Sequence, residues 1–258
     1  MDIGSFMVVY SALFGLALGS FMNVCIYRIP LKKSIVSPPS SCPNCGEKIR
    51  FYDNIPLISY LLLLGRCRHC RSPLAWHYPL VEALTALLSM ALFIRYGLSY
   101  QYFLYLLFTA ALVTISFIDL HHQIIPDVLS LSGIVVGCAA SFALDSVSWL
   151  DSLIGLVAGG GSLFLVAVVY ERITGREGMG GGDIKLLAMI GAWMGWRHLH
   201  LIVLLSSLVG AIVGISFLLM AGKGFRVRIP FGPFLSLGAM LCLFFGPELM
   251  NWYLRLLQ

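Results

Sequence analysis

The chain has 258 residues, of which 59% are hydrophobic and only 11% are charged, and its mean hydropathy is +0.90. A soluble domain carries about 25% charged residues, so this composition excludes an ordinary water-soluble globule and indicates a protein of the lipid bilayer. The net charge of +5 does not predict a nucleic-acid partner, because the basic residues lie in short loops between apolar runs rather than on one amphipathic face.

Eight apolar runs predict helices, because an open strand cannot satisfy its backbone hydrogen bonds in lipid. Since about 20 residues cross the hydrocarbon core, we expect an all-α polytopic membrane protein with about eight transmembrane helices. The first run follows the acidic Asp2 and has no cleavage motif, so we expect a retained span rather than a signal peptide. The sixth run is short and contains glycine, which leaves its bounds open. The runs are residues 6 to 28, 79 to 95, 101 to 118, 128 to 146, 150 to 170, 184 to 196, 200 to 221 and 231 to 254.

The polar segment of residues 29 to 78 divides the chain into three predicted parts. A first transmembrane helix, residues 1 to 28, precedes this segment, and a larger membrane core, residues 79 to 258, follows it. Loops rich in Lys and Arg stay in the cytoplasm, and placing residues 29 to 78 there puts 14 basic residues inside and three outside. Both chain ends then lie outside, and the segments that hold Asp119 and Asp183 emerge at the same inner face.

Four cysteines in the polar segment form two C-x2-C pairs, with 21 residues between the pairs. This spacing predicts a closed tetrahedral zinc site that stabilises a segment too small to fold on core burial alone. Disulfides are the less favoured alternative, because the cytoplasm keeps thiols reduced. Gly46 allows a tight turn after the first pair, whereas Arg71 stands at the matching place after the second, so we expect a looser second knuckle. The four predicted ligands are Cys42, Cys45, Cys67 and Cys70.

Two aspartates next to predicted spans are the candidate catalytic residues. Asp119 ends the third run, and Asp183 begins the sixth. Ionisable groups at membrane depth are costly and therefore point to function. Two carboxyls that lie close together share one proton, so the charged one can activate water while the protonated one polarises a peptide carbonyl and later protonates the leaving amine.

Structural roles for the acidic residues remain open alternatives at this point. Asp183 could cap the helix that follows it, and Asp119 could be an interfacial charge at a helix end. Asp127, which follows a proline and precedes an apolar run, is the better N-cap candidate. A catalytic metal held by His121 and His122 with the aspartates is a further alternative that needs more assumptions.

The glycine-rich segment before Asp183 is the candidate substrate loop. Its glycines permit backbone conformations that other residues disfavour, and they let an extended peptide approach closely. A phosphate-binding loop is excluded, because no G-K-[ST] follows the glycines. A plain flexible loop remains the structural alternative. The predicted loop residues are Gly180, Gly181 and Gly182.

The arrangement of motifs resembles the type IV prepilin peptidases, a family of membrane aspartic proteases. The matching pieces are D-x6-P-D from Asp119, the G-x-G-D motif that ends at Asp183, the segment GSFMNVCIYRIP from Gly19, the two cysteine pairs, and YPLVE from Tyr78. They cover nearly the whole chain in the family's order, so their combination is far more specific than any single motif.

The resemblance implies that Asp119 and Asp183 are the catalytic pair and that the substrate is a prepilin or pseudopilin, cut at the cytoplasmic face of the bacterial inner membrane. Many relatives with the cysteine-bearing segment also methylate the new amino terminus with S-adenosylmethionine. No Rossmann-type motif accompanies this expectation, and the residues that would bind the methyl donor are unknown. Asn23, Arg28 and Glu82 are of interest there.

Three other functions compete with the peptidase hypothesis. A proton- or cation-coupled transporter would use the aspartates in a path between the two faces, and a zinc-bearing scaffold would need no aspartate chemistry. A presenilin-type protease also carries G-x-G-D, but it would show Y-D and P-A-L motifs. Here Phe117 and Ile118 precede Asp119, and no P-A-L occurs.

Overall fold

The structure is a computed structural model that describes residues 3–176, 178–221 and 229–256. Asp2 and three of the basic residues predicted to face the cytoplasm, Lys223, Arg226 and Arg228, lie outside the described residues. By its internal contacts the chain divides into two compact units, Met1–Thr114 and Ile115–Gln258. Each unit is described by itself.

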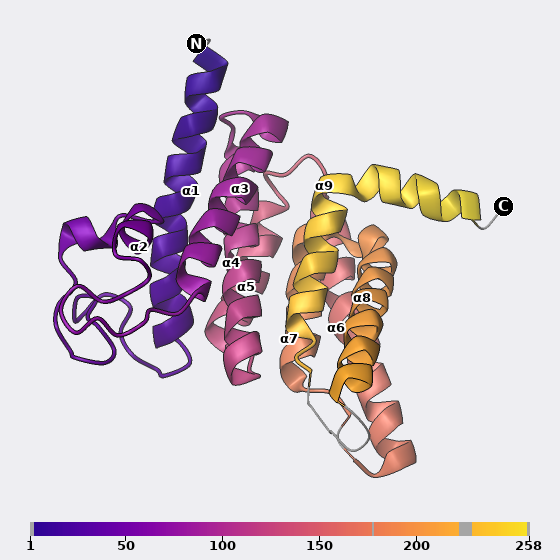
Figure 1. Cartoon of the computed structure of the whole chain (residues 1–258). Helices are drawn as coiled ribbons and strands as arrows, with labels where there is room; N and C mark the ends of the chain where they lie inside the picture. The colour runs from indigo at the N-terminus through magenta and orange to yellow at the C-terminus, as the bar shows by residue number, and fades with distance from the viewer. Residues whose placement is uncertain (1–2, 177, 222–228, 257–258) are drawn as a thin grey trace. The chain divides into compact units, whose positions relative to one another are not determined.

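The first unit pairs two long helices, α1 (Ile3–Arg28) and α3 (His77–Tyr96), which lie side by side (Figure 1). Glycines permit this close approach, because a Cβ on Gly19 would lie 2.7 Å from the Cα of Glu82. The Ser89 hydroxyl of α3 lies 2.6 Å from the carbonyl oxygen of Ser11 on α1 and donates to it. The unit also contains η1 (Phe51–Asn54), α2 (Ile58–Leu62) and the first part of α4 (Tyr100–His122).

The second unit is organised around α7 (Gly181–Met194), whose residues from Leu186 to Met194 are all buried. An apolar helix buried on every side needs neighbours that approach closely, and glycines provide them. A Cβ on Gly155 would lie 2.2 Å from the Gly191 carbonyl oxygen, and one on Gly137 would lie 2.6 Å from the Trp193 ring. The surrounding helices are α5 (Asp127–Ala140), α6 (Trp149–Thr174) and α9 (Gly232–Leu256), with η2 (Trp196–His198) and α8 (Leu199–Ala221) completing the unit.

Each predicted apolar run corresponds to one helix, so the expectation of an all-α membrane fold is confirmed, and the described residues contain only isolated β-bridges. Within the described ranges, six helices are long and apolar enough to cross a bilayer. The other two, α5 and α7, have 14 residues each, which is about 21 Å and short of the hydrocarbon core. The predicted number of eight transmembrane helices is therefore approximate.

Two helix boundaries differ from the predictions in ways that matter. Helix α4 continues to His122, so Asp119 lies within the helix rather than after its end. Helix α9 bends at Phe245, where φ is −129°. Pro247 accounts for the bend, because it has no N–H to donate to the carbonyl of Leu243 and its ring collides with that turn. Figure 1 shows the two arms of this helix in yellow.

Candidate active site and metal centre

Asp119 is buried near the C-terminal end of α4, with 5% of its surface exposed. Its Oδ2 atom accepts a hydrogen bond from the backbone N–H of Gly232, 3.0 Å away, at the first residue of α9. Two segments 113 residues apart in the chain therefore fix one carboxyl group. The free N–H groups at the start of a helix suit a carboxylate, since they have no partner within the helix.

Asp183 is the third residue of α7, is half-buried and lies outside the six candidate spans. Burial and the negative charge of Asp119 raise the pKa of the Asp183 carboxyl to about 6. The two carboxyl groups are thus close enough to interact, as a proton-sharing pair requires. The Ile125 side chain lies close to the starts of both α7 and α9, since its atoms would be 3.0 Å from a Cβ on Gly182 and 3.3 Å from one on Gly232.

The predicted substrate-loop residues lie at the start of α7, directly before Asp183. Gly180 is the N-cap residue, and its extended backbone leads into the helix that Gly181 begins. A Cβ on Gly181 would meet nothing within 4 Å, so one side of this turn is open. No side chain caps the helix, and the alternative in which Asp183 acts as its N-cap is therefore wrong.

Asp127 is not an N-cap either, because Pro126 occupies that position and Asp127 is the first residue of α5. Its Oδ1 atom instead lies 2.6 Å from the ammonium of Lys185, on the turn of α7 that carries Asp183. Both side chains are largely exposed, at 40% for Lys185 and 58% for Asp127. The pair joins α5 to α7 at the surface. The carboxylate of Asp127 bonds a cation rather than backbone N–H groups, which is why the capping prediction fails.

Gly232 is a site residue that the sequence analysis missed. A Cβ there would lie 2.6 Å from Asp119 Oδ2, so any larger residue would displace the carboxyl. The sequence signal was the pair Gly232 and Pro233, which indicates a helix start but says nothing of a contact 113 residues away. The alternative of a metal at His121 gains no support, since the four cysteines form the one group of potential metal ligands found among the described residues.

The four predicted metal ligands meet in the polar segment, with their sulfur atoms all within 4.8 Å of one another. The Sγ atoms of Cys42 and Cys70 are 3.8 Å apart. A tetrahedral zinc ion with Zn–S bonds of about 2.3 Å needs sulfurs about 3.8 Å apart, so the cluster fits that ion. Hydrogen bonds from Ser72 lower the pKa of Cys70 to about 6, which favours the thiolate that binds metal.

Both knuckles have the same backbone design, which corrects the expectation of a looser second one. The N–H of Gly46 donates to the carbonyl of Cys42 at 2.9 Å, and that of Arg71 donates to the carbonyl of Cys67 at 3.0 Å. Both turns require a left-handed residue, with φ of +72° at Gly46 and +56° at Arg71. Arg71 adopts the glycine-like conformation because the hydrogen bonds around it determine the turn.

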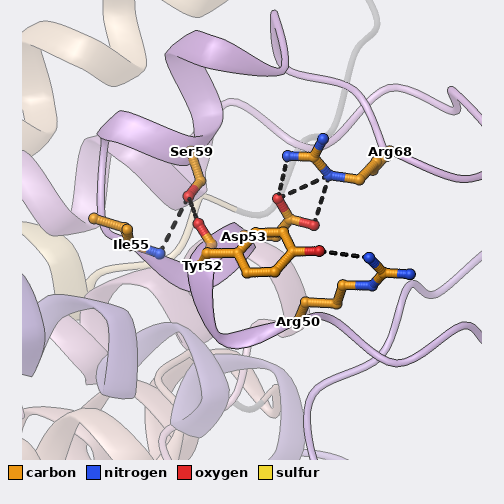
Figure 2. A network of polar contacts seen from close by, with 6 residues as sticks. All are labelled: Arg50, Tyr52, Asp53, Ile55, Ser59 and Arg68. Carbon is orange, nitrogen blue, oxygen red and sulfur yellow. Dashed lines mark hydrogen bonds and ion pairs between the residues drawn. The ribbon is translucent and has the colours of Figure 1, made fainter.

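A polar network ties the second knuckle to η1 (Figure 2). The guanidinium of Arg68 holds the Asp53 carboxylate with two parallel contacts, Nη2 to Oδ1 at 2.6 Å and Nε to Oδ2 at 2.8 Å. The Ser59 hydroxyl donates to the Tyr52 carbonyl at 2.8 Å. These bonds fix the segment between the cysteine pairs, where little apolar surface is buried.

Two family models match consecutive parts of the chain, in broad agreement with its division into two compact units. Residues 13–96 match the family model described as the bacterial peptidase A24 N-terminal domain, and residues 106–215 match the type IV leader peptidase family. No solved structure matches the chain.

Curated relatives match along most of the length. A prepilin leader peptidase/N-methyltransferase of Pseudomonas aeruginosa is 40% identical over 96% of this chain and 93% of the relative. Proteins with the same description from Aeromonas hydrophila and Myxococcus xanthus are 39% and 42% identical, over 94% and 85% of this chain and 92% and 66% of the relatives. With six apolar helices long enough to span a bilayer, the chain is an integral membrane protein that belongs to the type IV leader peptidase family.

Proposed function

We propose that this chain is a membrane aspartic endopeptidase that removes the leader from type IV prepilins or pseudopilins and then N-methylates the new terminus. The observation that carries the proposal is the interaction of Asp119 with Asp183, two carboxyls from different helices in a chain of the leader peptidase family. Relatives named for both activities match nearly the whole chain, including the cysteine-bearing segment.

The aspartate pair performs the hydrolysis by sharing one proton. The charged carboxyl takes a proton from a water molecule as the water oxygen attacks the scissile carbonyl carbon. The protonated carboxyl donates a hydrogen bond to the carbonyl oxygen and then supplies its proton to the leaving amine. The pair titrates as a unit, so the proton belongs to both groups rather than to one named residue.

The glycines before Asp183 serve as the binding edge for the extended leader. The open side of Gly181 leaves room for a second backbone, and Asp183, two residues further along, is only half-buried. Asp119 lies deeper and is oriented by the Gly232 N–H. This arrangement supports one accessible and one enclosed carboxyl, between which a peptide bond and a water molecule would be held.

The active site belongs at the cytoplasmic face of the bacterial inner membrane in this proposal. The excess of basic residues in the polar segment supports its cytoplasmic location. The first turn of α7 and the last turn of α4 carry the two aspartates at helix ends, where a helix leaves the apolar core. Chain segments 1–28 and 29–78 act as anchor and cysteine module, and segment 79–258 contains the peptidase core.

Two cofactors complete the proposal. Zinc, held by the four cysteines, stabilises the module of residues 29–78 without taking part in the chemistry, since four thiolates leave no open position. S-adenosylmethionine, when bound, would supply the methyl group for the amine that cleavage exposes.

The test uses purified protein in lipid nanodiscs with a prepilin, and product shortening is followed by mass spectrometry. We expect Asp119→Asn and Asp183→Asn each to reduce the rate by about a thousandfold, because each removes one half of the proton transfer. Asp127→Asn is the matched control and keeps its cleavage, since its carboxylate bonds Lys185. Continued cleavage by both of the first two variants would overturn the proposal. If the wild-type protein binds the prepilin but does not cleave it, the scaffold alternative is favoured.

A further inference from the structure

A cavity of about 210 Å³ lies between the C-terminal half of α1, the start of α3 and the cysteine module. All of its lining residues fall between Ser20 and Glu82, within the first unit. One buried water needs about 10–15 Å³ of such space, so the cavity has room for a small organic molecule. The catalytic candidates Asp119 and Asp183 and the four cysteine thiols of the metal cluster do not line it, and the peptidase mechanism gives it no role.

Two carboxylates line the cavity, and only one of them has a cationic partner. Asp53 is held by the guanidinium of Arg68 (Figure 2). Glu82 has 8% of its surface exposed, and its Oε2 atom accepts the N–H of Leu57 at 2.8 Å. Among the residues that the structure describes, no cation forms an ion pair with Glu82. A buried carboxylate without a counter-charge is costly, so the cavity is suited to a cationic ligand.

Asn23 supplies a hydrogen-bond acceptor without a donor beside the same cavity. Its Nδ2 atom donates to the carbonyl of Tyr78 at 3.0 Å, and this bond fixes the orientation of the amide. Its Oδ1 atom is buried and has no hydrogen-bond partner within the described ranges. Buried acceptors almost always have a donor, so an orphaned one beside a cavity indicates a ligand that donates.

The remaining lining provides aromatic surface and one further charge. Tyr27, Tyr60 and Tyr78 are among the lining residues, and a flat heterocycle can stack on tyrosine rings. Arg28 is also a lining residue with 9% of its surface exposed. Two of its five N–H groups donate to the carbonyls of Ser34 and Pro38, which holds the loop after α1 and leaves the others for a carboxylate.

We propose that this cavity binds the methyl donor, S-adenosylmethionine, with its cationic end at Glu82, its carboxylate toward Arg28 and its adenine on the tyrosines. The molecule combines a sulfonium, an ammonium, a carboxylate and an aromatic base, and the cavity offers a counterpart for each. Cations are also attracted to tyrosine faces, which suits the sulfonium. The inference rests on the proposed methyl transfer and assigns it a place in the first unit.

The test measures binding directly, with the full chain in nanodiscs and labelled S-adenosylhomocysteine or the ammonium analogue sinefungin in equilibrium dialysis. Glu82→Gln keeps an oxygen for the Leu57 N–H and removes the charge, so we expect sinefungin to bind at least tenfold more weakly. Asn23→Ala removes the orphaned acceptor and is expected to weaken both ligands. Glu47→Gln is the matched control, since this exposed carboxylate of the same module does not line the cavity. Zinc content and the melting temperature report on folding.

A second measurement uses the unaltered protein, so misfolding of a variant cannot decide the outcome. Ultraviolet cross-linking of labelled S-adenosylmethionine is expected to place the label on peptides from residues 20 to 82. Two results would overturn the cavity assignment if the wild type still methylates its substrate. One is cross-linked label on residues 115 to 258, and the other is unchanged sinefungin binding in Glu82→Gln. If Glu82→Gln weakens prepilin binding alone, the cavity holds the leader and the assignment is also wrong. A wild type that neither binds the donor nor methylates would refute the methyl transfer itself.

Discussion

The contact between Gly232 and Asp119 makes Gly232→Ala the most informative substitution in this protein. The new methyl group would start 2.6 Å from Asp119 Oδ2, whereas ordinary contacts begin at 3.4 Å. One of the two groups must therefore move by about 0.8 Å, and the Cδ1 atom of Ile125, 3.3 Å away, limits the escape of the methyl group. The 3.0 Å hydrogen bond from the Gly232 N–H to the carboxyl lengthens as a result.

The expected loss is about a hundredfold in kcat, because a misplacement of about 1 Å in a catalytic group costs roughly that factor. The weakened hydrogen bond to a carboxyl adds about 1.5–3 kcal/mol of destabilisation if it is lost entirely. The assay is prepilin cleavage in nanodiscs at saturating substrate, well below the melting temperature of each variant. Under these conditions a stability defect alone leaves kcat unchanged.

Gly238→Ala is the matched control on the same helix. Its Cβ would lie 2.6 Å from the Ser206 hydroxyl and 2.9 Å from the Ile202 carbonyl oxygen, so it meets a comparable collision away from the aspartates. We expect about 1–3 kcal/mol of destabilisation from overpacking, with kcat close to that of the wild type. Equal kcat values for the two variants would refute the reasoning that Gly232 positions Asp119.

Three further predictions follow from the same geometry. Arg71→Gly removes the strain of a left-handed conformation, so we expect the module to be equally stable or up to about 1 kcal/mol more stable, whereas Gly46→Ala should destabilise it by about 1 kcal/mol. Zinc release under chelator challenge measures both effects. Loss of zinc from Arg71→Gly would contradict the equivalence of the two knuckles. Cys42→Ser with Cys67→Ser is expected to abolish bound zinc and unfold the module, as measured by metal content and proteolysis; unchanged metal content would exclude the four-thiolate site. Gly155→Ala places a Cβ 2.2 Å from the Gly191 carbonyl oxygen and should lower the free energy of unfolding by about 3 kcal/mol or more. Gly161→Ala, whose Cβ would meet nothing within 4 Å, should be neutral or stabilising. Equal melting temperatures for the two variants would contradict the close packing of α6 on α7.

The helices and the metal ligands could be predicted from the sequence because each depends on local patterns. Apolar runs near the thickness of a bilayer leave helix as the available structure, and all eight runs became helices. The two C-x2-C pairs likewise met in one cluster, since each pair is held by its own turn. The bend at Phe245 was missed, although Pro247 stood in the predicted run, because that run was treated as one straight span.

Only the tertiary structure decided which distant groups meet. The sequence identified Asp119 and Asp183 as candidates but did not give the distance between them. The fold brings the two carboxyls close enough to interact electrostatically and places the N–H of Gly232 in hydrogen-bond contact with Asp119. It also gathers Asn23 and Glu82 around one cavity, where, among the described residues, the Asn23 Oδ1 atom has no hydrogen-bond partner and the Glu82 carboxyl has no ion-pair partner. A helix period or a cysteine spacing is set by neighbouring residues, whereas these contacts depend on how glycine-bearing helices approach one another, which local sequence does not specify.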